Sequence, residues 1–396
     1  MPETFKLDAL IIGGGVAGLW LLNRLRNEGY QAWLLEQDQL GAGQSIASQG
    51  MIHGGIKYAL GGKLTNASTA ISDMPAHWKQ CLGGSGDVDL RGCNLLSDDY
   101  YMWPRNSMRS RLNAFLGSKA LEARVEKVAF EHYPTFFKNN IPGPLYQLQD
   151  IVLDVPSLLS TLSENQQDCI FKIDWQHAEL VKNPDGSIKS LTFADGNEIQ
   201  AERYLFCCGA GAETVMNENR FTFTTMQRRP LRMAMVKHEI DDPVYVHCVS
   251  DKLTMTPEVT ITSHRNGAGE PVWYLGGELA EQGATQSEAE LIASAIKKLN
   301  SLFPWHNFST AEWATLEIDR AEEKQDDGSR PNGTSIATQD NIMLCWPTKL
   351  TLAPNLANQV IALFQKANLS PGDCSEPGLP AFLEKPGIAP TPWEHL

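Results

Sequence analysis

Residues Asp8–Glu36 read DALIIGGGVAGLWLLNRLRNEGYQAWLLE, and this stretch decides the fold. It begins with a short apolar run, which is typical of a buried strand, and continues into three consecutive glycines. Residues 16–28 then have apolar side chains at helical spacing, and a second apolar run ends at Glu36. A strand, a glycine turn, a helix and a second strand within about 30 residues predict a βαβ unit.

Three glycines of this unit, Gly13, Gly15 and Gly18, form the pattern G-x-G-x-x-G between the predicted strand and helix. The first permits a tight turn, the second lets the backbone approach a pyrophosphate, and the third lets the helix pack closely on the strand. The free N–H groups and the positive dipole end of the helix then face the phosphates. Glu36 ends the second strand, where a carboxylate can bind the hydroxyls of a ribose. The unit predicts a dinucleotide site that suits FAD and NAD equally.

The charge balance excludes some classes of partner. The chain of 396 residues has 33 Lys and Arg against 47 Asp and Glu, a net charge of −14. This excess of acid argues against nucleic acid or an anionic membrane surface as the main partner. The eight cysteines form no C-x-x-C pair, which indicates reduced thiols and a cytoplasmic protein. The apolar run Leu10–Leu22 is broken by glycines and is too short to span a bilayer, so we expect no stable membrane insertion.

The stretch that follows the βαβ unit places several glycines, which allow unusual backbone conformations, close to one histidine. Residues Ser48–Gly62 read SQGMIHGGIKYALGG, with His53 between glycines and a Lys-Tyr pair after them. Later segments are also distinctive: YLFCCGAGAE at 204–213, DRAEE at 319–323 and WPTKLTLAP at 346–354.

These segments together resemble the D-amino acid oxidase superfamily of FAD-dependent oxidoreductases. GMIHGGIKY is most similar to the branch of glycerol-3-phosphate and L-2-hydroxyglutarate dehydrogenases. YLFCCGAGAE is similar to the strand and glycine turn that return to the FAD domain, and WPTKLTLAP to the C-terminal flavin loop. DRAEE occupies the place of the family's G-x-R-P segment, although Arg320 is not followed by proline. The resemblance implies FAD as the cofactor.

The resemblance implies an α/β fold with two domains. One is an FAD-binding, Rossmann-like domain, doubly wound with a mixed sheet, and the other is a β-rich substrate domain. We expect the FAD-binding domain at 1–80, 148–218 and 332–396, and the substrate domain at 81–147 and 219–331. Within these, 66–140 has a polar, helical pattern, and the tail from Ser370, rich in Pro and Gly, is expected to be poorly ordered.

The same resemblance assigns residues to the flavin. In the family, the stretch around His53 passes along the flavin ring, where glycines let the backbone lie flat against a planar body. His53 would accept a proton from a hydroxyl or amine while hydride passes to flavin N5. The alternative is a hydrogen-bonded histidine that stabilises the loop. The other residues implied at the flavin are Gly50, Gly54, Gly209, Lys349, Leu350 and Thr351.

Four residues are candidates for binding an anionic substrate. Lys57 and Tyr58 follow His53 closely, and Lys349 lies in an otherwise apolar loop before a helix whose first turn contains Pro354. Arg320 could bind an anion bidentately, or could pair with Glu322 or Glu323. No His, Cys or acidic residues show metal-ligand spacing on a recognisable scaffold, so we predict no metal site.

The favoured function is oxidation of a C–OH bond in a small anionic substrate, a 2-hydroxy acid or a polyol phosphate. An amine oxidase acting on an amino acid or N-methyl amino acid uses the same fold, so fold does not separate the two. A non-catalytic FAD-binding assembly subunit is the alternative of another class. As electron acceptor, O₂, a quinone and a carrier protein are all compatible with the sequence.

Overall fold

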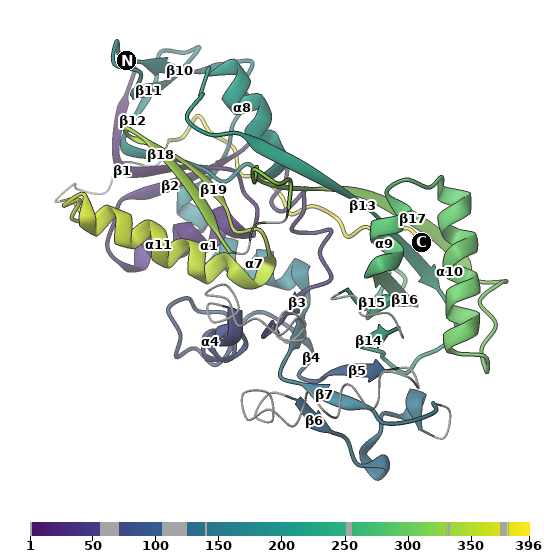
Figure 1. The fold of residues 1–396 in the computed structure, drawn as a ribbon. Coiled ribbons are helices and arrows are strands. Elements are labelled where there is room, and N and C mark those ends of the chain that lie inside the picture. Colours follow the sequence, from purple (N-terminus) through teal and green to yellow (C-terminus); the bar gives the residue numbers. More distant parts are fainter. Residues whose placement is uncertain are drawn as a thin grey trace.

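The structure is a computed structural model that describes residues 2–55, 71–104, 125–138, 141–250, 256–329, 331, 333–372, 378 and 380–396. Figure 1 shows its elements in chain order. The strands are β1 (Thr4–Ile12), β2 (Ala32–Glu36), β3 (Met51–Ile52), β4 (Leu95–Ser97), β5 (Tyr100–Pro104), β6 (Val125–Lys127), β7 (Tyr146–Leu148), β8 (Ile151–Leu153), β9 (Ile170–Lys172), β10 (Ala178–Lys182), β11 (Ile188–Phe193), β12 (Glu198–Phe206), β13 (Met226–Lys237), β14 (Val246–Val249), β15 (Val259–Arg265), β16 (Pro271–Gly276), β17 (Glu312–Glu323), β18 (Ser335–Gln339) and β19 (Ile342–Trp346). The α-helices are α1 (Val16–Asn27), α4 (Met74–Leu82), α7 (Val155–Glu164), α8 (Ala212–Glu218), α9 (Glu278–Gly283), α10 (Glu288–Leu302) and α11 (Ala353–Lys366). Short 3₁₀ helices are η2 (Phe130–His132), η3 (Thr135–Phe137), η4 (Gln167–Cys169), η5 (Gly209–Gly211) and η6 (Leu350–Leu352).

The first sheet is built around the predicted βαβ unit. Its parallel strands lie in the order β19-β12-β1-β2-β9, and β12 also pairs antiparallel with β11 at its N-terminal end. Strand β10 extends the sheet beside β11, and β18 runs antiparallel to β19. The sheet is therefore mixed, as predicted for a Rossmann-like domain.

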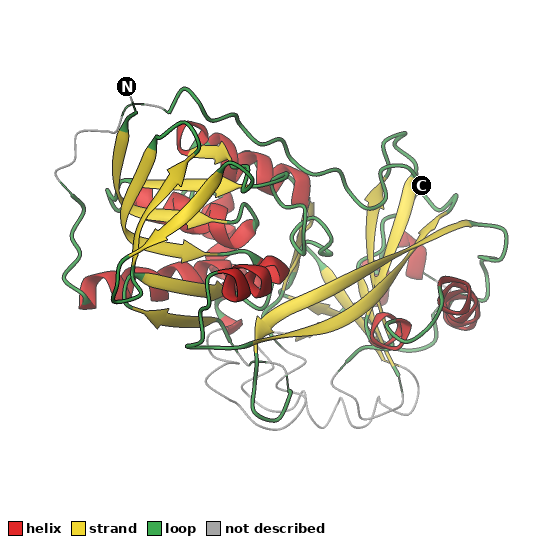
Figure 2. Ribbon diagram, turned by 90° about the horizontal axis from the view of Figure 1, so that it is seen from above, coloured by secondary structure: helices red, strands yellow, loops and turns green. Residues whose placement is uncertain are grey.

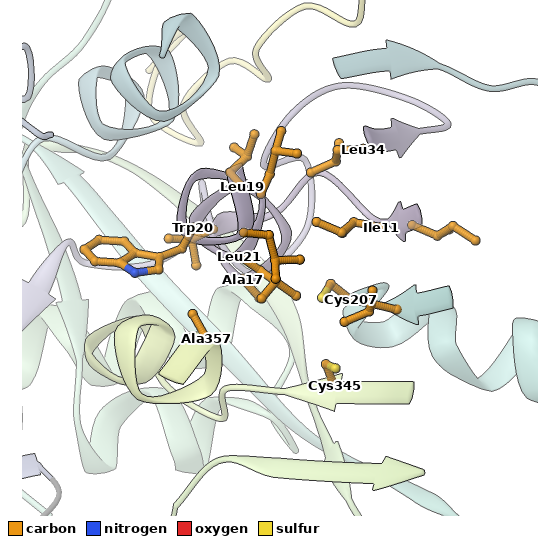
Figure 3. Close-up of a cluster of buried hydrophobic side chains, with 14 of the residues drawn as sticks. Ile11, Ala17, Leu19, Trp20, Leu21, Leu34, Cys207, Cys345 and Ala357 are labelled. Atoms are coloured by element: carbon orange, nitrogen blue, oxygen red, sulfur yellow. The ribbon is translucent and has the colours of Figure 1, made fainter. Parts of the chain in front are cut away.

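The first half of helix α1, residues 16–22, is apolar on all its faces and is buried on all of them. Trp20 on this helix is fully buried and lies 4.5 Å, centroid to centroid, from the ring of Trp78 on α4. Figure 3 shows Leu19 near Leu34 of β2 and Ala17 between the sheet and Ala357 of α11. A helix with apolar residues on all faces is expected only in a core, and this packing fixes where its N-terminus points.

The second sheet has the order β17-β13-β16-β15-β14-β5-β7-β6. Alternate side chains of β13 face opposite sides: Ala234 and Val236 pack with α9 and α10, whereas Met233 and Met235 face the other way. The long strands β13 and β17 pair along their whole length, and in Figures 1 and 2 they extend from the first sheet toward α9 and α10. The β-rich second domain is confirmed.

A third, small sheet has the order β3-β8-β4. It takes β3 and β8 from segments assigned to the FAD-binding domain and β4 from 81–147, so it lies where the two predicted domains meet. The exact domain boundaries stay a prediction.

Two sequence expectations about local structure are wrong. In the helical pattern of 66–140, the described residues include α4 but also strands β4, β5 and β6. The aromatic run of β5 is stabilised as a strand by long-range pairing with β14 and β7, which local periodicity does not show. In the tail, 380–396 is packed: Ile388 bridges Leu40, and Trp393, only 3% exposed, stacks on His264 at 4.0 Å.

The cysteines of the described residues are free thiols. Cys207 directly follows β12 and Cys345 lies on the neighbouring strand β19, and both point into the core shown in Figure 3. A hydrogen bond donated to Cys345 and burial raise the pKa of the Cys207 thiol well above its usual value, so it is held neutral. Among the helices of the described residues, none combines the length and apolarity that a membrane span requires.

Candidate functional site

An open cavity of about 980 Å³ lies between the first two sheets, a volume near the upper end of the range for cofactor sites. One wall comes from the βαβ unit and the segments that follow it, and the other from β13, β15, β16, β17 and α9. The segments of the first wall are 13–17, 36–39, 41–49, 207–211 and 345–350. Those of the second include 256–257, 276–277, 280–281 and 316–321, and 390–392 of the tail also contributes.

The glycine turn at one end of the cavity is sterically obligatory. Gly13 has φ +113°, and a Cβ there would lie 2.5 Å from the carbonyl oxygen of Cys207 on the adjoining strand. Gly15 caps α1 with extended backbone, and the N–H of Val16 donates to Ser45 Oγ at 2.9 Å. Gly18 packs against the carbonyl of Gly13 and lies outside the cavity lining, in the helix-packing role predicted for the third glycine.

Glu36 presents its carboxylate to the cavity from the end of β2. Its two oxygens accept from the N–H of Gly14 at 2.6 Å and from the N–H of Asp38 at 2.9 Å. These bonds fix the carboxylate next to the phosphate-binding turn, where an adenosine ribose would lie. The glycine cradle, the helix N-terminus and this acid fit FAD.

We predict that Glu36→Gln weakens FAD binding. The amide oxygen of Gln can still accept a hydrogen bond from the N–H of Gly14, but the side chain no longer carries a negative charge. A hydrogen bond from a ribose hydroxyl to a charged acceptor contributes about 1.5–3 kcal/mol, more than one to a neutral acceptor. We expect the Kd for FAD to rise about tenfold or more, measured by fluorescence of FAD released on dilution. Asp38→Asn is the control, because Asp38 lines the same cavity but is exposed. Equal retention in both variants would place the ribose contact elsewhere.

The predicted C-terminal flavin loop runs from Trp346 to η6, immediately before α11. Thr348 adopts φ +61°, and its hydroxyl donates to the carbonyl of Gly333 at 2.9 Å. Lys349 and Leu350 line the cavity, whereas Thr351 is buried. The N-terminus of α11, with a proline in its first turn as expected, follows directly.

His53 is close to this loop but is not among the cavity-lining residues. It is buried, and its backbone N–H donates to Thr351 Oγ1 at 3.2 Å. The N–H of Gly54 donates to Asp150 Oδ1 at 2.8 Å, and Gly50 has φ +68°. The structure thus brings the His53 segment and the flavin loop together, with Met51 as the nearest part of that segment on the wall.

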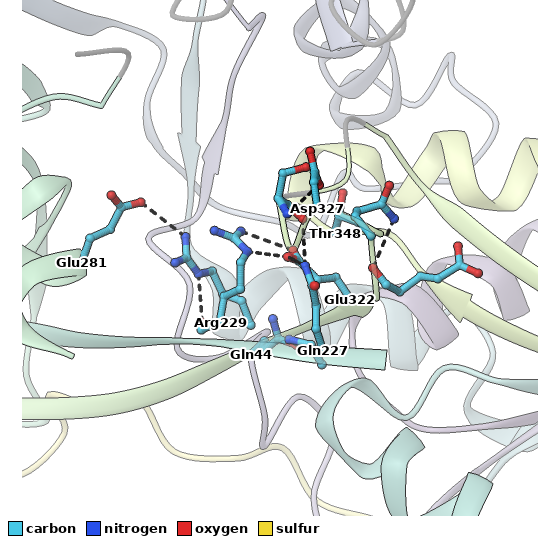
Figure 4. Close-up of polar contacts among 12 residues, drawn as sticks. Gln44, Gln227, Arg229, Glu281, Glu322, Asp327 and Thr348 are labelled. Carbon is cyan, nitrogen blue, oxygen red and sulfur yellow. Dashed lines mark hydrogen bonds and ion pairs between the residues drawn. The ribbon is translucent and has the colours of Figure 1, made fainter. Parts of the chain in front are cut away.

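Arg320 lines the cavity from β17, and Glu281, which no sequence pattern marks, lines it beside Arg320. Its guanidinium lies 3.7 Å from Glu281 on α9, and its Nε donates to the carbonyl of Arg229 at 3.2 Å. The expected partner Glu322 is instead buried and bound to Arg229 and Gln227, as Figure 4 shows. No sequence signal marks Glu281, because only the tertiary packing of α9 on β13, the neighbour of β17, brings it to Arg320.

Charge on the described part of the wall is not predominantly positive. It comprises the acids Glu36, Asp38, Glu281, Glu317 and Asp319 and the bases Arg228, Arg320 and Lys349. Arg228 is held by Glu213 at 2.8 Å and by Asp319 at 3.0 Å. Arg320 and Lys349 both line this one cavity, but beside acids. Lys57 and Tyr58 lie outside the described residues.

Comparisons with known proteins agree with this geometry. The family model described as "FAD dependent oxidoreductase" matches residues 8–331. A protein of Pseudomonas aeruginosa named as a probable FAD-dependent oxidoreductase is 42% identical over 397 residues, covering 100% of this chain and 99% of that protein. The crystal structure of the P. aeruginosa FAD-dependent oxidoreductase matches with a TM-score of 0.84 and 38% identity, covering 99% of each chain.

More distant solved structures share the fold. Glycine oxidase from Geobacillus kaustophilus matches with a TM-score of 0.65 and 14% identity, over 94% of this chain and 100% of that one. L-α-glycerophosphate oxidase from Mycoplasma pneumoniae, solved with FAD bound, matches with a TM-score of 0.65 and 14% identity, over 91% of this chain and 95% of that one. The two likenesses are equal, so they show the fold and do not separate the substrate classes.

The family match and the end-to-end relative confirm three predictions: the α/β fold, FAD as the cofactor, and an oxidoreductase activity. Both are described as oxidoreductases, which argues against the alternative of a non-catalytic FAD-binding subunit. The chain belongs to the DAO family of FAD-dependent oxidoreductases.

Proposed function

We propose that the protein oxidises a small amino acid or N-substituted amino acid at the carbon that bears the nitrogen. The observation that supports this most is the pair of Arg320 and Glu281 on one cavity wall. A cation and an anion side by side match the carboxylate and the ammonium group of a zwitterion. This proposal reverses the order of preference that the sequence alone suggested.

Each member of the pair has a defined role in binding. The guanidinium of Arg320 is planar and can bind a substrate carboxylate with two parallel hydrogen bonds. Glu281 lies 3.7 Å from that guanidinium and would accept hydrogen bonds from the substrate nitrogen. The side chain of Glu281 is 43% exposed, so it can rearrange as substrate enters. Together they would orient the α-carbon between them toward the interior of the cavity.

The redox chemistry depends on bound FAD, whereas side chains of the protein accept the proton. When bound, FAD supplies the acceptor for the hydride that leaves the α-carbon. A carboxylate oxygen of Glu281 can take the proton that the substrate nitrogen gives up. His53, the proton acceptor that the resemblance implies, is buried against Thr351 and does not line the cavity, so Glu281 is the better-placed acceptor. Lys349 and the N-terminus of α11 would stabilise negative charge that develops beside that loop.

A second candidate, oxidation of a C–OH bond in a 2-hydroxy acid or polyol phosphate, is favoured by a different observation. Arg320 and Lys349 both reach the cavity and could bind an anion that has no ammonium group. The segment GMIHGGIKY also resembles the glycerol-3-phosphate and L-2-hydroxyglutarate branch. Glu281 opposes this interpretation because it would repel a dianion such as a phosphate ester.

Substitution of Glu281 separates the two functions. Glu281→Gln should lower kcat/KM for an amino acid about tenfold, because a charged acceptor for the substrate nitrogen is lost at a partly exposed site. The same variant should leave kcat/KM unchanged or raised for the 2-hydroxy acid of identical carbon skeleton. The measurement is steady-state turnover of each matched pair, such as alanine with lactate.

Glu317→Gln is the matched control, since Glu317 lines the same wall but is paired with Arg232. It should leave the ratio of the two substrates as in the wild type. A wild-type preference for the hydroxy acid, together with an unaltered ratio in Glu281→Gln, would replace the amine proposal with the C–OH one.

A further inference from the structure

We propose that His77, Cys81 and Asp87 form a zinc site beside α1, away from the residues that line the cavity. Their ligand atoms, the His77 imidazole nitrogen, the Cys81 sulfur and an Asp87 carboxylate oxygen, all lie within 4.8 Å of one another. The prediction of no metal site follows from the lack of ligand spacing on a recognisable scaffold. Only two of these three groups share a helix, and Asp87 reaches them through an irregular turn.

Local structure brings the three groups together. His77 and Cys81 are one helical turn apart on α4, so their side chains lie on the same face. The helix ends at Leu82 and is capped by Gly83, and the turn that follows returns to the helix. The N–H groups of Ser85 and Gly86 donate to the carbonyl of Gln80. A Cβ at Gly86 would lie 2.7 Å from the backbone nitrogen of Cys81, so only glycine lets the turn approach this closely.

The distances are near those of a tetrahedral zinc site. Zinc bonds of about 2.0 Å to nitrogen or oxygen and about 2.3 Å to sulfur place N and O ligands about 3.3 Å apart, and S and O ligands about 3.6 Å apart. Here His77 Nε2 lies 2.9 Å from Asp87 Oδ1, and Cys81 Sγ lies 3.4 Å from the same oxygen. Movements of a few tenths of an ångström would bring these two separations to the zinc values, and His77 Nε2 and Cys81 Sγ lie within 4.8 Å of each other. A fourth position is left for water.

The surroundings of the cluster both orient its carboxylate and balance its charge. Arg24 on α1 binds the other oxygen of Asp87 at 3.0 Å, which leaves Oδ1 directed at His77 and Cys81. Arg24 is also paired with Glu28 at 3.2 Å. A Cys81 thiolate, Asp87 and Glu28 provide three negative charges, and Arg24 with a divalent ion provides three positive charges. An outer partner that fixes a metal-binding carboxylate is a usual feature of such sites.

Imidazole, thiolate and carboxylate in a tetrahedral arrangement favour zinc over magnesium or calcium, which prefer oxygen ligands. The ion would fasten α4 and its turn, and through Arg24 it would tie them to α1. On the inner side of α4, Trp78 packs on Trp20 and donates from its indole N–H to the carbonyl of Thr351 at 3.1 Å. Zinc would thus stabilise the helix that supports the flavin loop.

The test uses Co²⁺ as a spectroscopic probe on the FAD-loaded protein. Metal-free protein, prepared with a chelator, is titrated anaerobically with CoCl₂, and absorption is followed in the red region, where oxidised flavin does not absorb. We expect tetrahedral Co²⁺ bands that saturate near one ion per chain and disappear when ZnCl₂ is added. Removal of metal should also lower the Tm of the holoenzyme by a few degrees, reversed by ZnCl₂.

Variants identify the ligands. Cys81→Ser and His77→Asn should each abolish the tetrahedral Co²⁺ bands, whereas Cys93→Ser, at another buried cysteine nearby, should retain them. His77 is partly exposed, so His77→Asn tests the site even if Cys81→Ser does not fold. Wild-type protein that shows no tetrahedral Co²⁺ bands overturns the proposal. Bands of equal intensity in His77→Asn do so as well, and the cluster would then be a hydrogen-bonded ion pair only.

Discussion

Gly13→Ala is expected to give a protein that retains no FAD and unfolds at a lower denaturant concentration. The backbone of Gly13 has φ +113°, which a residue with a Cβ adopts only under strain. The added methyl group would also lie 2.5 Å from the carbonyl oxygen and 2.7 Å from the carbonyl carbon of Cys207, which is backbone and cannot rotate away. Strain and overpacking together should lower the free energy of unfolding by about 2–6 kcal/mol.

The loss of FAD follows from the position of this turn. The N–H groups that would face the pyrophosphate belong to the backbone after Gly13, so displacing the turn misplaces them and the N-terminus of α1 together. The flavin-to-protein absorbance ratio of the purified variant measures the effect. Gly43→Ala is the matched control, because Gly43 lines the same cavity but a methyl group added there would meet no atom within 4 Å. FAD content equal to that of Gly43→Ala would show that the glycine turn does not bind the pyrophosphate.

Arg320→Met is expected to raise the KM for the carboxylate substrate about 10- to 150-fold, with a smaller change in kcat. This range corresponds to the loss of about 1.5–3 kcal/mol from charged hydrogen bonds to the carboxylate. Arg320 is suited to this role because its guanidinium lines the cavity and lies 3.7 Å from Glu281, a distance that leaves the contact easy to exchange for a substrate carboxylate.

Two further variants make the result specific. Arg320→Lys retains the charge but not the planar fork, so it should recover only part of the affinity. Arg228→Met should leave KM near the wild-type value, because Arg228 lines the same cavity but is held by Glu213 and Asp319. Equal KM values for Arg320→Met and Arg228→Met would show that the substrate carboxylate binds elsewhere. Steady-state kinetics on FAD-saturated proteins provides the comparison.

The parts of the fold that the sequence predicts are those governed by local periodicity and turn geometry. The βαβ unit, its glycines and the acid at the end of β2 lie within one short stretch, so their spacing alone identifies them. By contrast, local periodicity does not separate β5 from the helical pattern around it. Its pairing with β14 joins residues about 145 positions apart, for example Tyr101 with Val246. The packed tail escapes local reasoning for the same reason, since Trp393 is ordered by contact with His264.

In the candidate site, too, local sequence patterns identify some residues and miss those that depend on long-range contacts. Arg320 and Lys349 could be selected because they lie in DRAEE and WPTKLTLAP, two segments that resemble the family, and both line the cavity. Glu281 could not, since it lies in an ordinary polar helix and becomes a candidate only where α9 packs on β13 and its side chain approaches Arg320 of β17. The cluster of His77, Cys81 and Asp87 depends on a glycine turn whose geometry the sequence does not specify. In each case the missing information is a contact between segments that local sequence patterns do not connect.

The most direct test of the central claim is anaerobic reduction of the enzyme-bound flavin by matched substrates. Purified protein would be mixed without oxygen with amino acids, N-methyl amino acids, the corresponding 2-hydroxy acids and glycerol 3-phosphate, while the visible band of oxidised flavin is followed. We predict that one or more of the amino acids bleaches this band rapidly and that the hydroxy acid of the same skeleton does so far more slowly. Rapid bleaching by a hydroxy acid or by glycerol 3-phosphate, with none by the amino acids, would contradict the proposed function.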